Sequence, residues 1–157
     1  MKLKYVSWLP AVIIMIIIFY FSSKPADNSN ENSMTMANKV LTVYEDISGN
    51  HFEERIKVLE NLNHIVRKGA HFSEYAILAM AFAFHFAVLK KKRIRVFFLP
   101  ILLSCIYALT DEFHQTFIPG RSGMIQDVFI DTTGAIAGTL VFALLLIVNE
   151  RGQKLRL

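Results

Sequence analysis

Residues 70–113 read AHFSEYAILAMAFAFHFAVL, KKKRIR and VFFLPILLSCIYALTDEF, which are two apolar runs with a short basic segment between them. At about 1.5 Å of rise per residue, the runs 70–89 and 96–113 can each form a helix that crosses most or all of a hydrocarbon core about 30 Å thick. Only residues 90–95 connect them. So short a connection predicts an antiparallel pair of membrane-spanning helices.

Two further apolar runs, residues 5–21 and 125–148, flank this hairpin. Lys2 and Lys4 precede the first run as they would in a secretory signal, but the run is long and no small-x-small cleavage site follows, so we expect a retained helix. The chain of 157 residues is 54% hydrophobic, and its apolar residues occur in blocks typical of membrane spans. We predict an all-α membrane protein, with a bundle of four transmembrane helices forming one domain over residues 1–157.

The charged residues between the spans predict their direction. If the amino terminus is inside, residues 1–4, 90–95 and 149–157 are cytoplasmic, and they hold ten Lys or Arg residues and one acid. Residues 22–65 then lie outside, and they hold four bases and seven acids. Because cytoplasmic loops carry an excess of Lys and Arg, both termini are predicted to be inside. Orientation in the bilayer, rather than nucleic acid as a partner, therefore explains the net charge of +4.

Residues 22–65 form the predicted outer segment. Turn-forming and polar residues open it, which predicts a loop over residues 22–28. Further on, Ile56, Leu59 and Val66 recur at helical spacing with charged residues between them. This pattern predicts an amphipathic helix that lies on the membrane surface or covers the bundle, and a weaker helical pattern occupies residues 37–47.

Polar residues gather at the predicted outer ends of the second and fourth spans. Arg67, His71 and Glu74 share one face of a helix, because their spacing is close to one and two turns. Asp127 and Asp131 share a face at the start of the fourth span, together with the small-xxx-small pattern 134–138, which favours close helix packing.

The third span contributes the residues at its outer end, which are Asp111, Glu112, His114 and Gln115. Asp111, His114 and Gln115 are neighbours across one helical turn. A Pro-Gly turn at residues 119–120 then directs Arg121 back over the helix ends. An ionisable group at membrane depth costs about 2.5–3.5 kcal/mol unless it faces the bundle or pairs. The sequence therefore predicts one shared polar pocket, in which Arg67 and Arg121 offset the carboxylates.

Three interpretations of this pocket remain open. The charges could serve only to fix the register of the helices, or the arginines could hold a polar or anionic ligand of the cell envelope. In the third interpretation, an enzyme uses His71 or His114 as a general base, a carboxylate to orient it and an arginine to stabilise negative charge. The catalytic candidates are His71, Glu74, Asp111, His114 and Asp127. The ligand-binding candidates are Arg67, Glu112, Gln115, Arg121 and Asp131. No zinc-protease spacing is present, so no metal is assigned, and the residues identify no cofactor.

These motifs together resemble the VanZ-like family. The resemblance is carried by Arg67-Lys68-x-x-His71-Phe72-x-Glu74-Tyr75, by Asp111-Glu112-x-His114-Gln115-x-Phe117-x-Pro119-Gly120-Arg121, and by Asp127, Gly134 and the Phe19–Pro25 segment. It covers nearly the whole chain except the middle of the outer segment. Where the family often has an asparagine near the position of Asp131, this chain has an aspartate.

The resemblance implies a multi-pass protein of the bacterial cytoplasmic membrane with a role in the cell envelope. The namesake of the family is associated with low-level resistance to the glycopeptide teicoplanin. The resemblance therefore implies a glycopeptide or a lipid-linked cell-wall compound as ligand, with the lipid bilayer as surroundings. Two alternatives stand beside this one: an intramembrane enzyme acting on a lipid-linked envelope substrate, and a structural or partner-binding membrane subunit.

Overall fold

The computed structural model describes residues 3–154, with side chains described for residues 3–150. Within that range the chain is 84% helical and has no strand, which confirms the prediction of an all-α chain. The helices, in chain order, are α1 (Leu3–Val6), α2 (Leu9–Ser22), α3 (Ala26–Ser48), α4 (Arg55–Val88), α5 (Arg93–Gln115) and α6 (Ile125–Lys154).

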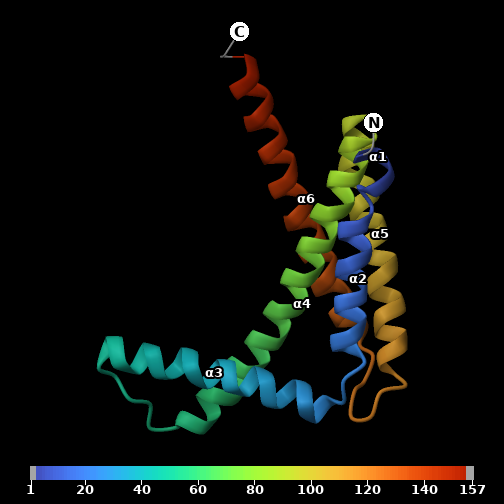
Figure 1. Ribbon diagram of the computed structural model, residues 1–157. Helices are drawn as coiled ribbons and strands as arrows, with labels where there is room; N and C mark the ends of the chain where they lie inside the picture. The colour runs from blue at the N-terminus through green and yellow to red at the C-terminus, as the bar shows by residue number, and fades with distance from the viewer. Residues whose placement is uncertain (1–2, 155–157) are drawn as a thin grey trace.

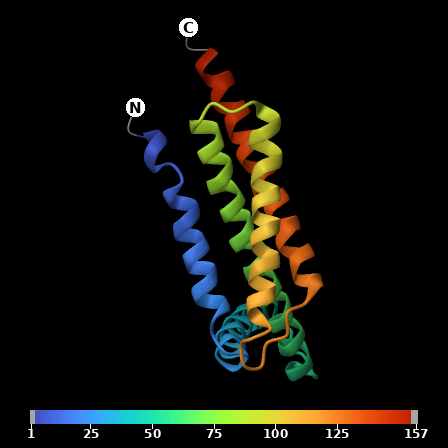
Figure 2. The ribbon, with the colours of Figure 1, turned by 90° about the vertical axis from the view of Figure 1, so that its right-hand side faces the viewer.

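Four helical stretches are long and apolar enough to cross a membrane. They are Leu3–Ser22, Arg55–Val88, Arg93–Gln115 and Ile125–Glu150. The first combines α1 and α2, which are separated at Ser7 and Trp8, and Pro10 stands in the first turn of α2, where a proline is tolerated. Figure 2 shows α2, α4, α5 and α6 side by side in one bundle.

The helix α4 is longer than the predicted second span. Its 34 residues extend for about 51 Å at about 1.5 Å per residue, more than a hydrocarbon core is thick. It begins at Arg55 rather than near residue 70, so the predicted amphipathic helix and the predicted span are parts of one helix. No proline separates them, and Gly69 alone costs only about 1 kcal/mol relative to alanine.

The helix α3 lies across the end of the bundle where α2 ends, as Figure 1 shows. It buries Ser33, Ala37, Leu41 and Glu45, which are spaced by four residues, and it packs against α4. The expectation of a loop over residues 22–28 is wrong for Ser22, which ends α2, and for residues 26–28. A proline inside a helix breaks its hydrogen bonding, but a proline at a helix start is tolerated. The helix α3 accordingly begins directly after Pro25.

The core is made around α4, which packs against α2, α3, α5 and α6. Its most buried side chains include Tyr75, Leu78 and Ala79, and small residues such as Ala108 and Ala135 face them from α5 and α6. The α4–α5 connection lies at the same end of the bundle as α1 and the last turns of α6 (Figures 1 and 2). The polar ends of α4, α5 and α6 therefore all lie at the opposite end, beside α3.

Candidate functional site

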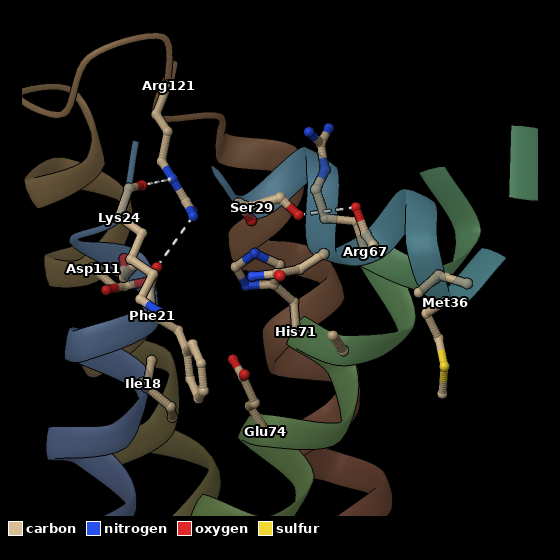
Figure 3. Close-up of a pocket in the computed structure, with 15 residues that line it drawn as sticks. Ile18, Phe21, Lys24, Ser29, Met36, Arg67, His71, Glu74, Asp111 and Arg121 are labelled. Atoms are coloured by element: carbon tan, nitrogen blue, oxygen red, sulfur yellow. Dashed lines mark hydrogen bonds between the residues drawn. The ribbon is translucent and has the colours of Figure 1, made fainter. Parts of the chain in front are cut away.

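A cavity of about 260 Å³ lies at the α3 end of the bundle. Five of the predicted site residues line it: Arg67, His71, Glu74, Asp111 and Arg121. In Figure 3, Arg67 and Arg121 stand on opposite sides, His71 lies between them, and Glu74 lies one turn further along α4. The cavity thus joins residues from three separate parts of the sequence.

Arg121 fastens the α5–α6 connection to the end of α2. Its Nε donates to the carbonyl oxygen of Lys24 at 2.9 Å, and its Nη2 donates to that of Phe21 at 3.2 Å. Nη1 donates to Gln115 Oε1 at 3.3 Å. Burial lowers the pKa of the Arg121 guanidinium, the nearby Asp111 carboxylate raises it, and an arginine stays charged at physiological pH. A permanent positive charge is therefore held at the edge of the cavity.

The end of α5 supplies a buried polar cluster beside the cavity. Gln115 Nε2 donates to Asp111 Oδ2 at 3.0 Å and to Glu112 Oε1 at 3.3 Å. Glu112 Oε2 also accepts a hydrogen bond from the backbone nitrogen of Met124 at 2.8 Å. Since Met124 precedes the first turn of α6, Glu112 places a carboxylate at the positive end of that helix dipole. Glu112 and Gln115 thus hold α5 to α6 and orient Asp111.

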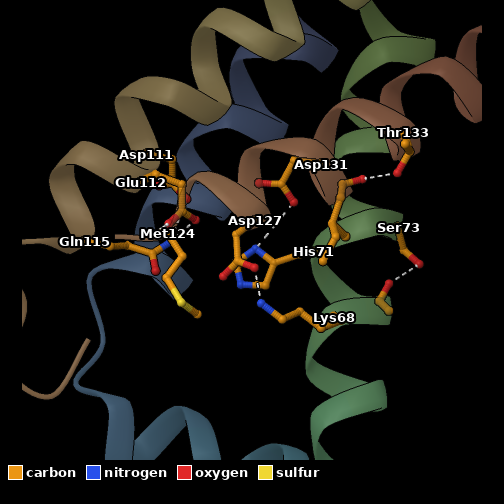
Figure 4. Close-up of polar contacts among 12 residues, drawn as sticks. Lys68, His71, Ser73, Asp111, Glu112, Gln115, Met124, Asp127, Asp131 and Thr133 are labelled. Atoms are coloured by element: carbon orange, nitrogen blue, oxygen red, sulfur yellow. Dashed lines mark hydrogen bonds and ion pairs between the residues drawn. The ribbon is translucent and has the colours of Figure 1, made fainter. Parts of the chain in front are cut away.

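Two contacts join α4 to α6 at the same level (Figure 4). Lys68 Nζ forms an ion pair with Asp127 Oδ1, and the two side chains are 15% and 13% exposed. His71 Nδ1 lies 3.8 Å from Asp131 Oδ1, and the Asp131 side chain is fully buried. Asp127 also lines a smaller cavity of about 70 Å³, together with His71 and Arg121. The carboxylates of α6 therefore face α4, and His71 lies between Asp131 and the main cavity.

Glycines on α6 allow these contacts. A Cβ atom added at Gly134 would overlap the carbonyl oxygen of Phe72, and one added at Gly138 would overlap that of Ala76. The backbones of α4 and α6 thus touch directly at two successive turns. The predicted small-xxx-small pattern is the contact surface, and its neighbour is α4.

Several buried polar atoms at this level have no hydrogen-bond partner within the described part of the chain. They are Ser22 Oγ, His71 Nδ1, the Tyr75 hydroxyl, Asp111 Oδ1 and both carboxylate oxygens of Asp131. Unpartnered polar atoms are uncommon in protein interiors because each costs about 1–3 kcal/mol. Over the same residues, no group of three or more His, Cys, Asp or Glu side chains is arranged to hold a metal ion.

Two predicted features of the site differ from the structure. His114 is absent from the lining of the main cavity: its ring stacks on Phe19 at 4.7 Å between centroids, and its Nε2 lies 3.2 Å from Ser23 Oγ. Among the described side chains, neither Arg67 nor Arg121 forms an ion pair within 4.0 Å. The expected charge-assisted hydrogen bonds from these arginines to Glu74, Asp127 and Asp131 do not form among the described side chains.

Lys68 is the residue that the sequence interpretation missed. It stands next to Arg67 in the motif, but adjacent residues on a helix point about 100° apart. That rotation turns Lys68 toward α6 and Arg67 toward α2 and α3. The helical spacing Lys68, His71 and Tyr75 is the signal that could have identified it as facing the bundle.

A family model described as VanZ/LLP1 matches residues 7–146 of the chain. A search of curated proteins found no match. A search of solved structures also found none. The matched residues include all of α4 and α5, most of the first and fourth apolar stretches, and every residue of the cavity lining.

Proposed function

The chain belongs to the VanZ/LLP1 family, and on that premise we propose that it is a multi-pass protein of the bacterial cytoplasmic membrane that binds a polar cell-envelope ligand in an outward-facing cavity. Its four apolar helices support a place in a bilayer. The association of the family's namesake with teicoplanin resistance supports a contribution to glycopeptide susceptibility. We treat residues 1–157 as one functional domain.

The charge distribution supports the outward orientation. The end of the bundle that carries α1, the α4–α5 connection and the end of α6 is the basic end, with eight Lys or Arg residues and one acid in residues 3–4, 90–95 and 149–154. Positive loops remain on the cytoplasmic side. Both termini then lie inside, and α3 and the cavity lie at the outer surface.

One observation carries the proposal: Arg67 and Arg121 face one cavity from opposite sides, and neither forms an ion pair within 4.0 Å with a described carboxylate. A guanidinium is well suited to binding planar or tetrahedral anions. We assign Arg67 and Arg121 to ligand binding. Gln115, which accepts a hydrogen bond from Arg121, and Glu112, which accepts one from Gln115, are assigned to positioning Arg121. Asp131 is assigned to positioning His71.

Teicoplanin susceptibility tests this proposal. We expect expression of the chain to raise the inhibitory concentration of teicoplanin in a susceptible host, and Arg67→Ala, Glu74→Ala and Arg121→Ala to abolish the increase. Lys57→Ala is the matched control, because Lys57 also lies on α4 and its side chain is 73% exposed. Membrane abundance of each variant is measured alongside. If all three variants kept full resistance, the cavity would not be responsible for the resistance.

A reaction on a lipid-linked envelope substrate is the second candidate function, and the His71–Asp131 contact favours it. A carboxylate near one ring nitrogen of a histidine can orient the ring as a general base. In that reaction His71 would be the base, with Glu74, Asp111 and Asp127 around it. Mass spectrometry of lipid extracts from deletion and overexpressing strains tests this, and unchanged lipid precursors in both strains would count against catalysis.

A further inference from the structure

Exposed apolar side chains form a continuous stripe along α3. The stripe consists of Met36, Val40, Val43, Tyr44 and Ile47, which are between 47% and 82% exposed. We propose that this α3 stripe lies in the lipid leaflet at the cavity end of the bundle, so that α3 is an interfacial helix covered by the bilayer itself. The inference goes beyond the proposed function, because it assigns a lipid partner to α3 rather than a ligand to the cavity.

Three faces run along α3. At about 100° of rotation per residue, the α3 stripe falls within a sector about 100° wide. Next to it lies the buried face, which packs against α4 through Ser33, Ala37, Leu41 and Glu45. The remaining face exposes polar side chains, among them Thr35, Lys39, Thr42 and Asp46. An exposed apolar stripe marks a contact surface, and its combination with a polar face is typical of a helix that lies in a membrane surface.

Figure 3 shows which way the α3 stripe points. The side chain of Met36 extends in the direction in which α4 runs from Arg67 to Glu74, which is the direction of the membrane spans. The other stripe residues share its face of the helix and therefore point to the same side. In Figure 1, α3 extends sideways beyond α4, so its later turns lie beside the bundle. The stripe thus faces the space around the spans, which is lipid in a membrane.

The level of α3 along the bundle agrees with the position of a membrane surface. Met36 lines the main cavity together with Val66 and Ala70 of α4. The helix α3 therefore crosses α4 about one turn before or at the start of the apolar run 70–89. At about 1.5 Å per residue, that run extends for about 30 Å, the thickness of a hydrocarbon core. The α3 stripe then lies at the boundary between lipid head groups and acyl chains.

The charges of α3 indicate how it would bind the leaflet. Lys39 is its one base, and its acids are Asp27, Glu31, Glu45 and Asp46. Anionic head groups would repel this helix, so the contact depends on burial of the apolar stripe. Tyr44 at the edge of the stripe stacks on Phe52 with 5.8 Å between ring centroids, and tyrosine is enriched at membrane–water interfaces. A water-soluble partner would not reach a face that is turned toward the spans.

Spin labels on neighbouring residues test the α3 stripe. The single cysteine, Cys105, is replaced with alanine, and a nitroxide is attached to one new cysteine in each variant. Val43→Cys and Ile47→Cys probe the stripe, and Thr42→Cys and Asp46→Cys are the matched controls on the polar face. Each full-length variant is placed as a single copy in a phosphatidylcholine nanodisc. The unfolding midpoint of each labelled variant is compared with that of the unaltered chain, so that only folded protein is scored.

Electron paramagnetic resonance then measures collisions of each label with oxygen, which concentrates in the bilayer, and with a nickel chelate, which stays in water. We expect the ratio of oxygen to chelate collisions to be several times higher at positions 43 and 47 than at 42 and 46. That ratio should correspond to a depth of about 5–10 Å, as for other interfacial helices.

Equal ratios at neighbouring positions would overturn the inference, because the stripe would then face water. Low collision rates with both reagents at positions 43 and 47 would also overturn it, because protein rather than lipid would cover the stripe. A lipid-like ratio that appears only in discs holding two copies would assign the stripe to a second copy of the chain. None of these outcomes depends on teicoplanin susceptibility, so the lipid contact of α3 and the proposed ligand site are tested separately.

Discussion

The ion pair at the α3 end of the bundle is buried, so its residues should affect stability more than those of an exposed ion pair. Lys68 and Asp127 are largely buried and pair with each other, whereas Arg93 and Glu150 form an ion pair at the other end with side chains 78% and 51% exposed. An exposed pair contributes little, because water and salt screen it. A buried pair is costly to break, because the remaining charge keeps its desolvation penalty without its partner.

Removing one member of the buried pair should therefore destabilise the protein more than removing both. We expect Lys68→Met to lower the free energy of unfolding by about 3–5 kcal/mol, and Lys68→Met combined with Asp127→Leu to restore much of that loss. Arg93→Gln should cost at most about 1 kcal/mol. Denaturant unfolding in detergent measures all three. Equal losses for Lys68→Met and Arg93→Gln would contradict this account of the buried pair.

Substitutions of the two candidate histidines, His71 and His114, should have different effects on the cavity. His71 lines it, whereas His114 stacks on Phe19 of α2. We expect His71→Phe to abolish the rise in the inhibitory concentration of teicoplanin, because it removes a polar group from the cavity lining. His114→Phe keeps an aromatic ring against Phe19 and should leave that rise unchanged. Inhibitory concentrations for the two variants, with membrane abundance measured alongside, test this, and a larger loss for His114→Phe would return His114 to the site.

The residue types of the site were predictable from the sequence, but their partners were not. Helical spacing placed Arg67, His71 and Glu74 on one face, and all three line the cavity. Which cation meets which carboxylate depends on the rotation of α4 against α6, and a single sequence does not specify that rotation. Lys68 was missed for this reason, and His114 was placed in the cavity although it faces α2.

At the scale of the elements, the direct contact of α4 with α6 positions the site. Gly134 and Gly138 bring the two backbones together, and Asp127 and Asp131 then reach Lys68 and His71. The four spans were predictable from the sequence, because the length and composition of an apolar block are enough to identify a membrane-spanning helix. The start of α4 was not predictable in the same way. Its first turns are polar, and the structure shows that they continue the same helix and pack against α3.

A methyl group added at the α4–α6 contact should force the two helices apart and destabilise the protein. In Gly138→Ala the added Cβ overlaps a backbone oxygen that no rotamer change can move, so we expect a loss of about 1–3 kcal/mol in the free energy of unfolding. Gly69→Ala is the matched control. It adds the same methyl group in open space on α4 and should stabilise the helix by about 0.5–1 kcal/mol. Changes of opposite sign in the free energies of unfolding of the two variants would support the direct contact. An unchanged free energy of unfolding in Gly138→Ala would refute it.

The whole molecule has two chemically different ends, and the proposed function depends on which side of the membrane each faces. The basic end carries α1, the α4–α5 connection and the end of α6, and the other end carries the cavity beneath α3. A cavity for an external ligand must open where that ligand arrives. The sidedness of the bundle is thus a direct test of the function at the scale of the whole chain.

Reporter fusions can determine this sidedness. We expect alkaline phosphatase to be active when fused after Gly49, in the α3–α4 connection, and inactive when fused after Lys92, in the α4–α5 connection. A cytoplasmic reporter such as green fluorescent protein should give the opposite pattern, because it folds and fluoresces only inside the cell. In the proposed orientation, the five cationic residues in positions 90–95 keep the α4–α5 connection on the cytoplasmic side. Replacing all five with glutamine should therefore produce a mixed orientation, with phosphatase activity at both positions. An active phosphatase after Lys92 in the unaltered chain would place the cavity in the cytoplasm and overturn the proposed envelope function.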